Sequence, residues 1–234
     1  MTAQNADVDT LRRLIFGRAT CRAYLSDPVP EDVIRSIVDV ARGTASWCNT
    51  QPWDLVVTSG ESTGRFRDAL MEQARQHPAL DSDFPFPEEY RGVYLDRRRR
   101  SGLQLYEALG IARGDKERRN AQSFENFRLF GAPHVAIVTV PQELGTYGAV
   151  DAGGVVGTFL LSAQAHGVAT TPQAALAMQS GFIRRYFGMP EGRKVVCGIS
   201  FGYADTAHPV NGYRTERAGV DDFLRLEWRH GHAA

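Results

Sequence analysis

The chain has 234 residues, of which 43% are hydrophobic and 23% are charged, and these values suit one globular domain with a sizeable core. Its 27 Lys and Arg residues balance its 27 Asp and Glu residues, so the net charge gives no reason to expect a nucleic acid or an anionic membrane as partner. The three cysteines form no C-x-x-C pair, which argues against a disulfide framework or a structural zinc site, and no metal site is expected.

The first part of the chain predicts two helices and a strand. The polar first ten residues lack the apolar core of a signal peptide, and together with the cysteine usage they predict a cytoplasmic protein. Apolar residues recur at helical spacing from Val33 to Ala41, so residues 31–43 predict an amphipathic helix. A short strand is expected over 53–58, and a polar helix over 62–76.

The middle of the chain, residues 77–130, is irregular because three prolines interrupt it before any helix can form. Within it, residues 95–111 and 120–130 predict helices. The second half contains more regular patterns. These patterns predict a strand over 134–140, an apolar helix over 151–166, a strand over 193–203, an extended tail over 204–219 and a closing helix over 220–229.

Strands and helices do not alternate as a regular parallel repeat would require, so the chain predicts an α+β domain with a small central sheet. The uncharged stretch 152–173 contains Gln164 and His166. A membrane-spanning helix needs about 20 mainly apolar residues. This stretch is therefore interpreted as a buried core helix and the segment after it.

Side chains must hold any nucleotide phosphate, because neither G-x-G-x-x-G nor G-x-x-x-x-G-K-[ST] occurs. Arg18, Thr20 and Arg22 would share one side of an extended segment. Arg214 and Arg217 offer the same chemistry in the tail. Guanidinium and hydroxyl groups match the oxygens of a phosphate. Taken alone, each segment is better explained by surface arginines that pair with acids.

Two polar loops have groups that could contact the flat ring of a bound cofactor. Ser46, Asn49 and Gln51 lie beside tryptophans, and their groups suit a flat ring whose edge alternates carbonyls and nitrogens, although a turn explains them equally well. In the second loop, the backbone N–H groups of Ala174 and Ala175 could bind an electron-rich ring atom. Taken alone, that loop is better explained as the first turn of an ordinary helix.

Other features favour ordinary structural roles. Arg97–Arg100 is interpreted as a solvated helix face, although the run could attract the phosphates of a dinucleotide. Phe124, Phe127 and Phe130 have helical spacing and are expected in the core. The six histidines lack a metal-ligand spacing, and no Ser/His/Asp set can be assembled.

Five segments in order resemble the nitroreductase family over nearly the whole chain. The first, GRATCRAYLSDPVPEDVIRSIVDVARGTASWCNTQPWDLVV, is the most specific of the five. The others are FRLFGAPHVAIVTV, DAGGVVGTFLLSAQAHGVATTPQAAL, GMPEGRKVVCGISFGYAD and HPVNGYRTERAGVDDFL. The chain departs from the family's frequent Pro-Ser-Ser at Ala45–Trp47, and Ala19 lacks the polar side chain of many relatives.

The resemblance implies one domain over 1–234, with a small, mainly antiparallel sheet flanked by helices. It implies an interlocked homodimer, in which an extension over 204–234 wraps the partner and FMN lies noncovalently at the interface. The insert 77–130, which matches the family poorly, is expected over the active site.

The resemblance also implies the flavin contacts. Phosphate, ribityl and pyrimidine-edge contacts are expected from Arg18, Thr20 and Arg22. Contacts that reach the flavin mainly from the partner subunit are expected from Ser46, Trp47, Cys48, Asn49 and Gln51. Pro172, Gln173, Ala174 and Ala175 are expected along the ring. Arg217, together with Arg214, is expected to close on the phosphate, and Arg128 is a weaker match to a basic ring contact.

The family's chemistry implies hydride transfer from NADPH or NADH to a small aromatic oxidant, nitroaromatic or quinone-like, by a ping-pong mechanism. No catalytic side chain is named, because the flavin does the chemistry. Two alternatives stay open. One is the same fold acting on another oxidant or on flavin itself, as in flavin reductases and reductive dehalogenases. The other is a non-enzymatic FMN-binding or storage protein.

Overall fold

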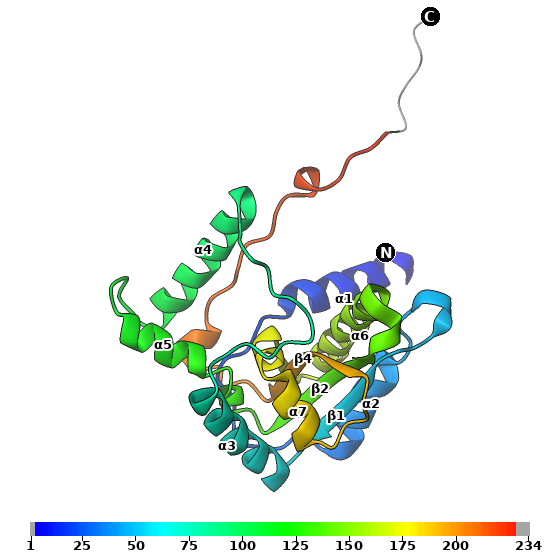
Figure 1. Cartoon of the computed structure of the whole chain (residues 1–234). Coiled ribbons are helices and arrows are strands. Elements are labelled where there is room, and N and C mark those ends of the chain that lie inside the picture. Colours follow the sequence, from blue (N-terminus) through cyan, green and yellow to red (C-terminus); the bar gives the residue numbers. More distant parts are fainter. Residues whose placement is uncertain (1–2, 228–234) are drawn as a thin grey trace, which may run out of the picture.

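The protein forms a four-stranded sheet between helices (Figure 1), as seen in a computed structural model that describes residues 3–227. The strands are β1 (Asp54–Thr58), β2 (His134–Pro141), β3 (Ala169–Gln173) and β4 (Arg193–Gly202). The α-helices are α1 (Ala3–Gly17), α2 (Glu31–Ala41), α3 (Glu61–Gln76), α4 (Gly92–Ala108), α5 (Lys116–Phe124), α6 (Gly145–Ala165) and α7 (Ser180–Tyr186).

The sheet has the order β1-β2-β4-β3, and all three pairings are antiparallel. Its two central strands, β2 and β4, are almost wholly buried. The expectation of an α+β fold with a small antiparallel sheet flanked by helices is therefore confirmed. β3 lies at one edge, where Pro172 is tolerated because an edge strand can leave one side unpaired.

Alternate residues of β2 enter two apolar layers, as a strand buried on both faces requires. Ala136 and Val138 pack with Phe159 of α6 and Ile37 of α2 on one face. On the other face, Val135 and Ile137 pack with residues of α3 and α7 such as Phe66 and Ile183. The two layers enclose the sheet and fix the position of its β3 edge.

Helix α6 packs on α2 and on the sheet, so the predicted core helix exists. Residues 142–165 are also long and apolar enough to cross a membrane, with a mean hydropathy of 1.2, but only by length and composition. Core helices of soluble proteins pass the same test. One face of α6 is buried, whereas Tyr147 and Val150 at its N-terminal end are more than half exposed.

Several predicted elements differ from the observed ones. Sequence patterns missed α1, whose apolar residues such as Val8 and Leu11 are exposed in this chain, and they missed β3 because Pro172 argues against a strand. The helix predicted over 120–130 is wrong beyond Phe124, because Leu129 and Phe130 adopt positive φ. The predicted helix over 220–229 is only the 3-10 turn η6 (Val220–Asp222), and residues 228 and 229 lie outside the described part.

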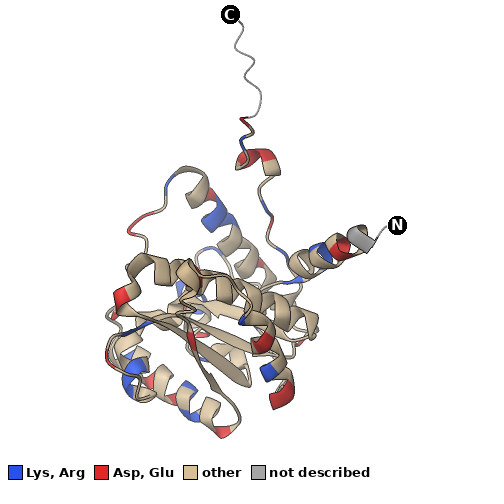
Figure 2. Cartoon of the chain, turned by 90° about the vertical axis from the view of Figure 1, so that its right-hand side faces the viewer, with Lys and Arg blue, Asp and Glu red and all other residues tan. Residues whose placement is uncertain are grey.

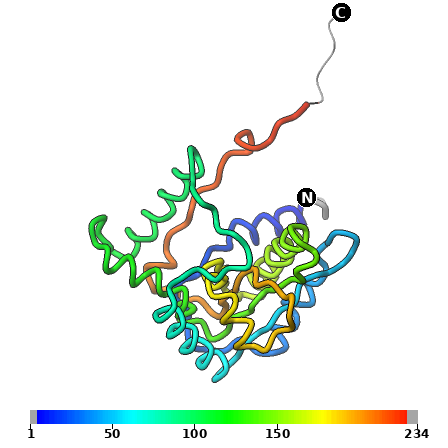
Figure 3. The backbone as a smooth tube through the Cα atoms, viewed as in Figure 1, coloured from blue at the N-terminus to red at the C-terminus, as the bar shows by residue number. Residues whose placement is uncertain are grey.

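α4 and the tail stand away from the sheet, next to each other (Figures 1 and 3). Neither α4 nor α5 has a buried residue. Arg100 of α4 forms an ion pair with Glu216 of the tail at 2.8 Å. The Gln104 side chain donates a 3.5 Å hydrogen bond to the Arg214 carbonyl. These contacts align the tail with α4 outside the core.

Candidate functional site

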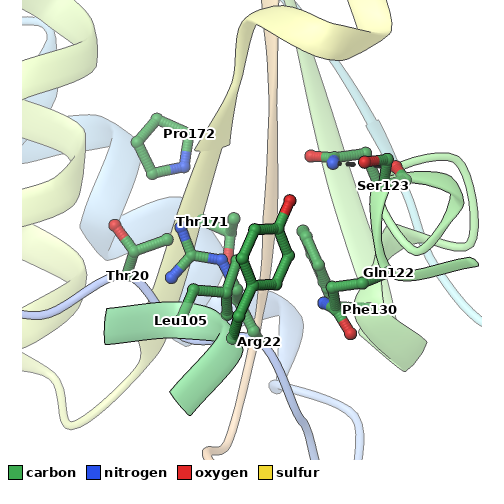
Figure 4. A pocket seen from close by; sticks show the side chains of 10 residues that line it. Thr20, Arg22, Leu105, Gln122, Ser123, Phe130, Thr171 and Pro172 are labelled. Atoms are coloured by element: carbon green, nitrogen blue, oxygen red, sulfur yellow. Dashed lines mark hydrogen bonds between the residues drawn. The ribbon is translucent and has the colours of Figure 1, made fainter. Parts of the chain in front are cut away.

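A cavity of about 200 Å³ lies between the β3 edge of the sheet and the two helices of the insert. Figure 4 shows Thr20, Thr171 and Pro172 facing Gln122, Ser123 and Phe130 across it. The other lining residues are Arg22, Leu105, Tyr106 and Asn126. Two segments far apart in the sequence, 18–24 and 169–173, therefore meet at one site.

The segment after α1 runs along β3 as an added edge. Thr20 forms a parallel bridge with Thr170, and the Cys21 N–H donates to the Thr170 carbonyl at 3.1 Å. The Thr171 hydroxyl donates to the Cys21 carbonyl. Because an extended segment alternates its side chains, Thr20 and Arg22 both face the cavity.

Tyr24 holds the segment 18–24 against β3 and β4. Its hydroxyl lies 2.7 Å from Thr171 Oγ1 and donates to the Ser200 carbonyl at 3.1 Å. Burial raises the pKa of Tyr24 well above its usual value, so the phenol stays neutral and can donate. A buried hydrogen-bonded network of this kind holds Thr171 and its neighbour Pro172 in place.

The start of the tail is clamped onto the same edge. The Asn211 carboxamide accepts from the Arg22 N–H at 2.8 Å and donates to the Ala23 carbonyl at 2.8 Å. The Tyr213 hydroxyl accepts a 3.0 Å hydrogen bond from the Arg22 guanidinium. The tail thus leaves the body next to Arg22, which brings Arg217 close to the site.

Arg18, on the segment that lines the cavity, and Arg217, in the tail, form no ion pair within residues 3–227. Arg18 Nη1 is buried and has no hydrogen-bond partner among the described residues. Burial, and then the nearby charge of Arg217, lower the pKa of Arg18 below its usual value. Within residues 3–227, Arg217 donates to Thr215 and to the Glu216 carbonyl, and to no acid. Like charges that approach each other at a partly buried position favour an anion between them.

The C-terminal end of β3 carries the other expected ring contacts. Gln173 is buried, and its side chain donates to the Asn126 carbonyl at 2.8 Å and accepts from Ser200. That side chain is therefore occupied by the protein itself. Ala174 and Ala175 begin the 3-10 helix η4 (Ala174–Met178), whose first N–H groups have no partner inside the helix.

The loop with Ser46 lies against the N-terminal part of α6, whereas β3 follows the C-terminal end of that helix. The Trp47 N–H donates to the Asp151 carboxylate at 3.1 Å, and its ring contacts Tyr147 with centroids 4.7 Å apart. Cys48, Asn49 and Gln51 have positive φ, a conformation that costs about 1–3 kcal/mol per residue. In the described part of this single chain, the cavity is lined by none of the five residues expected to contact the flavin from this loop, Ser46, Trp47, Cys48, Asn49 and Gln51.

Two more expected contacts also lie apart from the cavity. Arg128 is exposed and sits 3.7 Å from Glu125, and Arg214 donates to the carbonyls of its own segment. The cavity residues that sequence patterns missed come mainly from the insert. Phe130, assigned to the core, is buried and also lines the cavity. The polar run Gln122, Ser123 and Asn126 has helical spacing, which could have indicated one shared face.

A model of the Nitroreductase family matches residues 15–203 of this chain. Nitroreductase NfnB of Mycolicibacterium smegmatis is 40% identical over 215 residues, which cover 92% of this chain and 91% of that protein. The 4-nitrobenzoate reductase of Pseudomonas putida is 32% identical over 218 residues, covering 93% and 96%.

The fold is likewise shared with a solved structure. The crystal structure of the FMN-dependent nitroreductase NfnB from Mycobacterium smegmatis in complex with NADPH superposes with a TM-score of 0.89 and 38% identity. The match covers 94% of this chain and 99% of that chain. The likeness thus includes the insert and the start of the tail as well as the sheet.

Proposed function

The chain belongs to the nitroreductase family, and on that premise we propose that it is an FMN-dependent oxidoreductase that transfers electrons from NAD(P)H to nitroaromatic acceptors. The observation that carries the proposal is the buried guanidinium nitrogen of Arg18, which has no hydrogen-bond partner and lies within reach of the charge of Arg217, while neither arginine forms an ion pair within residues 3–227. An FMN phosphate would supply the missing negative charge.

The residues present fit this cofactor. Arg18 and Arg217 would hold the phosphate, and Arg214 lies close by in the same segment. Thr20 and Arg22 would contact the ribityl chain and the pyrimidine edge, because both side chains already line the cavity. Pro172–Ala175 would lie along the ring. The Gln173 side chain is committed to Asn126 and Ser200, so this position would act through its backbone.

Bound FMN would take up a hydride from NAD(P)H and return two electrons to the oxidant, and the protein's own task would be to bind and orient. Both reactants would use one open face in turn, because β3 and the segment 18–24 occupy the other side of the cavity. The insert residues Leu105, Tyr106 and Phe130 would exclude water from that face.

The working form would be a homodimer. Large apolar side chains are exposed along α1, at Val8, Leu11 and Ile15, with the helical spacing of a contact face. Trp47 and the tail residues Phe223 and Leu226 are also more than half exposed. A second copy would cover these surfaces. It would also bring its own loop 46–51 to the flavin and be wrapped by the tail, 204–234.

Nitroaromatic acceptors are favoured because the relatives at 40% and 32% identity are a nitroreductase and a 4-nitrobenzoate reductase. We place the protein in the cytoplasm, with no nucleic acid or membrane as partner, since its charges balance and it has no C-x-x-C pair. The whole chain would act as one domain, with 77–130 as the insert over the flavin.

Anaerobic stopped-flow of the purified yellow protein tests this function. NADPH or NADH should bleach the visible absorbance of the flavin, with a first-order rate constant on the order of 1–1,000 per second. A nitroaromatic should then restore the absorbance, with no donor present. Reduction without reoxidation by nitroaromatics would favour another oxidant on the same fold. Bound FMN that neither donor reduces would favour a storage protein.

A further inference from the structure

The face of α4 that lines the cavity continues outward as a basic surface. Leu105 and Tyr106 line the cavity. Arg98 and Arg99 precede them by seven residues. Seven residues make about two helical turns, so each arginine shares a stripe with a cavity residue, roughly 10 Å further along the axis.

The face of α4 between Arg98 and the cavity contains a glycine. Gly102 lies on the stripe between Arg98 and Leu105. A Cβ atom placed on Gly102 would meet no heavy atom within 4 Å. No side chain of α4 therefore stands between Arg98 and Leu105, whereas Leu103, which is half exposed, lies between Arg99 and Tyr106.

Three of the four arginines in the run carry no compensating acid. Arg100 is paired with Glu216 at 2.8 Å. Arg97, Arg98 and Arg99 form no ion pair within residues 3–227, and Asp96 on the same helix neutralises none of them by direct contact. Arg98 instead lies over the Tyr90 ring at 5.0 Å, a cation–π contact that leaves its N–H groups without an acidic partner. Figure 2 shows the run in blue on α4.

We propose that Arg98 and Arg99 bind the phosphates of the dinucleotide donor. The inference rests on the proposed function, since it places the nicotinamide in the cavity against the flavin. The phosphates of NAD(P)H are separated from the nicotinamide by a ribose, so a nicotinamide bound in the cavity would place them further along the surface of the protein. The stripe past Gly102 leads to Arg98 and Arg99, which have no acidic partner within residues 3–227, and guanidinium groups pair bidentately with phosphate oxygens.

The contacts between α4 and the tail support this position for the phosphates of the donor. The ion pair of Arg100 and the hydrogen bond of Gln104 dock the neighbouring face of α4 on the tail, next to the segment with Arg217. One basic surface would thus bind the FMN phosphate at Arg18 and Arg217. A separate one, on the adjoining stripe of α4, would bind the donor.

The test uses the FMN-loaded protein and a double variant, Arg98→Ala with Arg99→Ala. Calorimetry with NADP⁺ and NAD⁺, which bind without reacting, measures the dissociation constants. Each lost charge-assisted contact should weaken binding about tenfold. In stopped-flow, the limiting rate of flavin reduction should change little, because neither arginine touches the reacting atoms. The matched control is Arg75→Ala, which removes an exposed arginine from α3.

The two ligands separate the phosphates involved. Weaker binding of NADP⁺ alone assigns the arginines to the 2′-phosphate, and weaker binding of both assigns them to the pyrophosphate shared by the two donors. Unchanged dissociation constants for both, or an equal loss in Arg75→Ala, would overturn the inference. A wild-type protein whose flavin neither donor reduces would instead refute the proposed function, whatever the variants do.

Discussion

The two sides of the cavity differ in what holds them in place. On the sheet side, Thr171 and Gln173 are buried and hydrogen-bonded to the neighbouring strand or segment. On the other side, α4 and α5 have no buried residue, and the Arg100–Glu216 ion pair that docks α4 is about two-thirds exposed. Exposed pairs contribute only about 0–1 kcal/mol. The sheet side of the cavity is thus built by the core, whereas the α4 side depends on the tail.

This difference has a consequence for dynamics. Segments with few buried apolar contacts open locally at low free-energy cost, while core strands open only with the whole domain. Under the proposed function, α4 would admit two different reactants in turn over a cofactor that would stay fixed at the β3 edge. Changes to the tail should act on assembly and on α4, and changes at the sheet edge should act on the flavin or on stability.

The largest effect is expected from shortening the tail after Ala218. This cut keeps Asn211, Tyr213 and Arg217 but removes the exposed apolar residues between Val220 and Leu226. Each large side chain buried in a partner is worth about 1.5–3 kcal/mol. The shortened protein should run as a monomer in size-exclusion chromatography with light scattering. A matched cut after Leu226 should stay dimeric, and a dimer after both cuts would contradict the account.

A smaller effect is expected from Arg217→Ala, which should weaken FMN binding without lowering the stability of the flavin-free protein. FMN binding should weaken by about tenfold or more, as measured by flavin fluorescence. The melting temperature of the flavin-free protein should not fall, because the substitution removes a positive charge that lies close to Arg18. Arg225→Ala, on the same tail, serves as the control. A loss of melting temperature without loss of FMN affinity would show that Arg217 is structural.

The free energy of unfolding should depend on pH through His134, a buried residue of the central strand β2. Its Nε2 accepts from the Val29 N–H at 2.8 Å, and Nδ1 lies 3.1 Å from the Thr58 carbonyl, so the neutral ring with the proton on Nδ1 fits both partners. Burial lowers the pKa of His134 below its usual value. The unfolded chain then binds more protons in acid, and the free energy of unfolding should fall below about pH 6.5, by up to roughly 1.4 kcal/mol per pH unit.

Urea unfolding of the flavin-free protein at pH 7.5 and pH 5.5, at one protein concentration, measures this fall. His134→Gln should be less stable at pH 7.5 and should lose less stability on acidification than the wild type. An equal pH dependence of the two proteins would show that other groups cause the fall.

The smallest effect is expected from Arg98→Ala on flavin binding. Arg98 lies about two helical turns outside the cavity, so the FMN dissociation constant should change by less than about twofold. Flavin fluorescence at one salt concentration, with Arg217→Ala measured in parallel, checks the prediction. If Arg98→Ala loses flavin and Arg217→Ala does not, the phosphate site has been assigned to the wrong arginines.

How far the sequence predicted the fold follows from the strength of each local pattern. The buried strands around Ile137 and Ile199 and the amphipathic α2 have clear periods, and all were predicted. β3 was missed because a strand at a sheet edge can contain Pro172, and only pairing with β4 identifies it. α1 was missed because its apolar residues Val8, Leu11 and Ile15 do not enter the core of this chain.

The site was predictable where the chemistry is local. Arg18, Thr20 and Arg22 alternate on one extended segment, and the structure brings Thr20 and Arg22 to the same cavity as Pro172. The contribution of Tyr106 or Asn126 was not predictable, because it depends on how α4 and α5 fold over the sheet edge. The positive φ of Leu129 and Phe130, which turns the chain into β2, has no signature in the sequence.

The most direct test of the central claim is the ratio of the dissociation constants for riboflavin and FMN, which differ only by the phosphate. If Arg18 and Arg217 bind that phosphate, the wild type should favour FMN by at least about a hundredfold, since two charge-assisted contacts are involved. In the double variant Arg18→Ala with Arg217→Ala the ratio should fall close to one. Equal affinities in the wild type, or a ratio that survives the double substitution, would contradict the account.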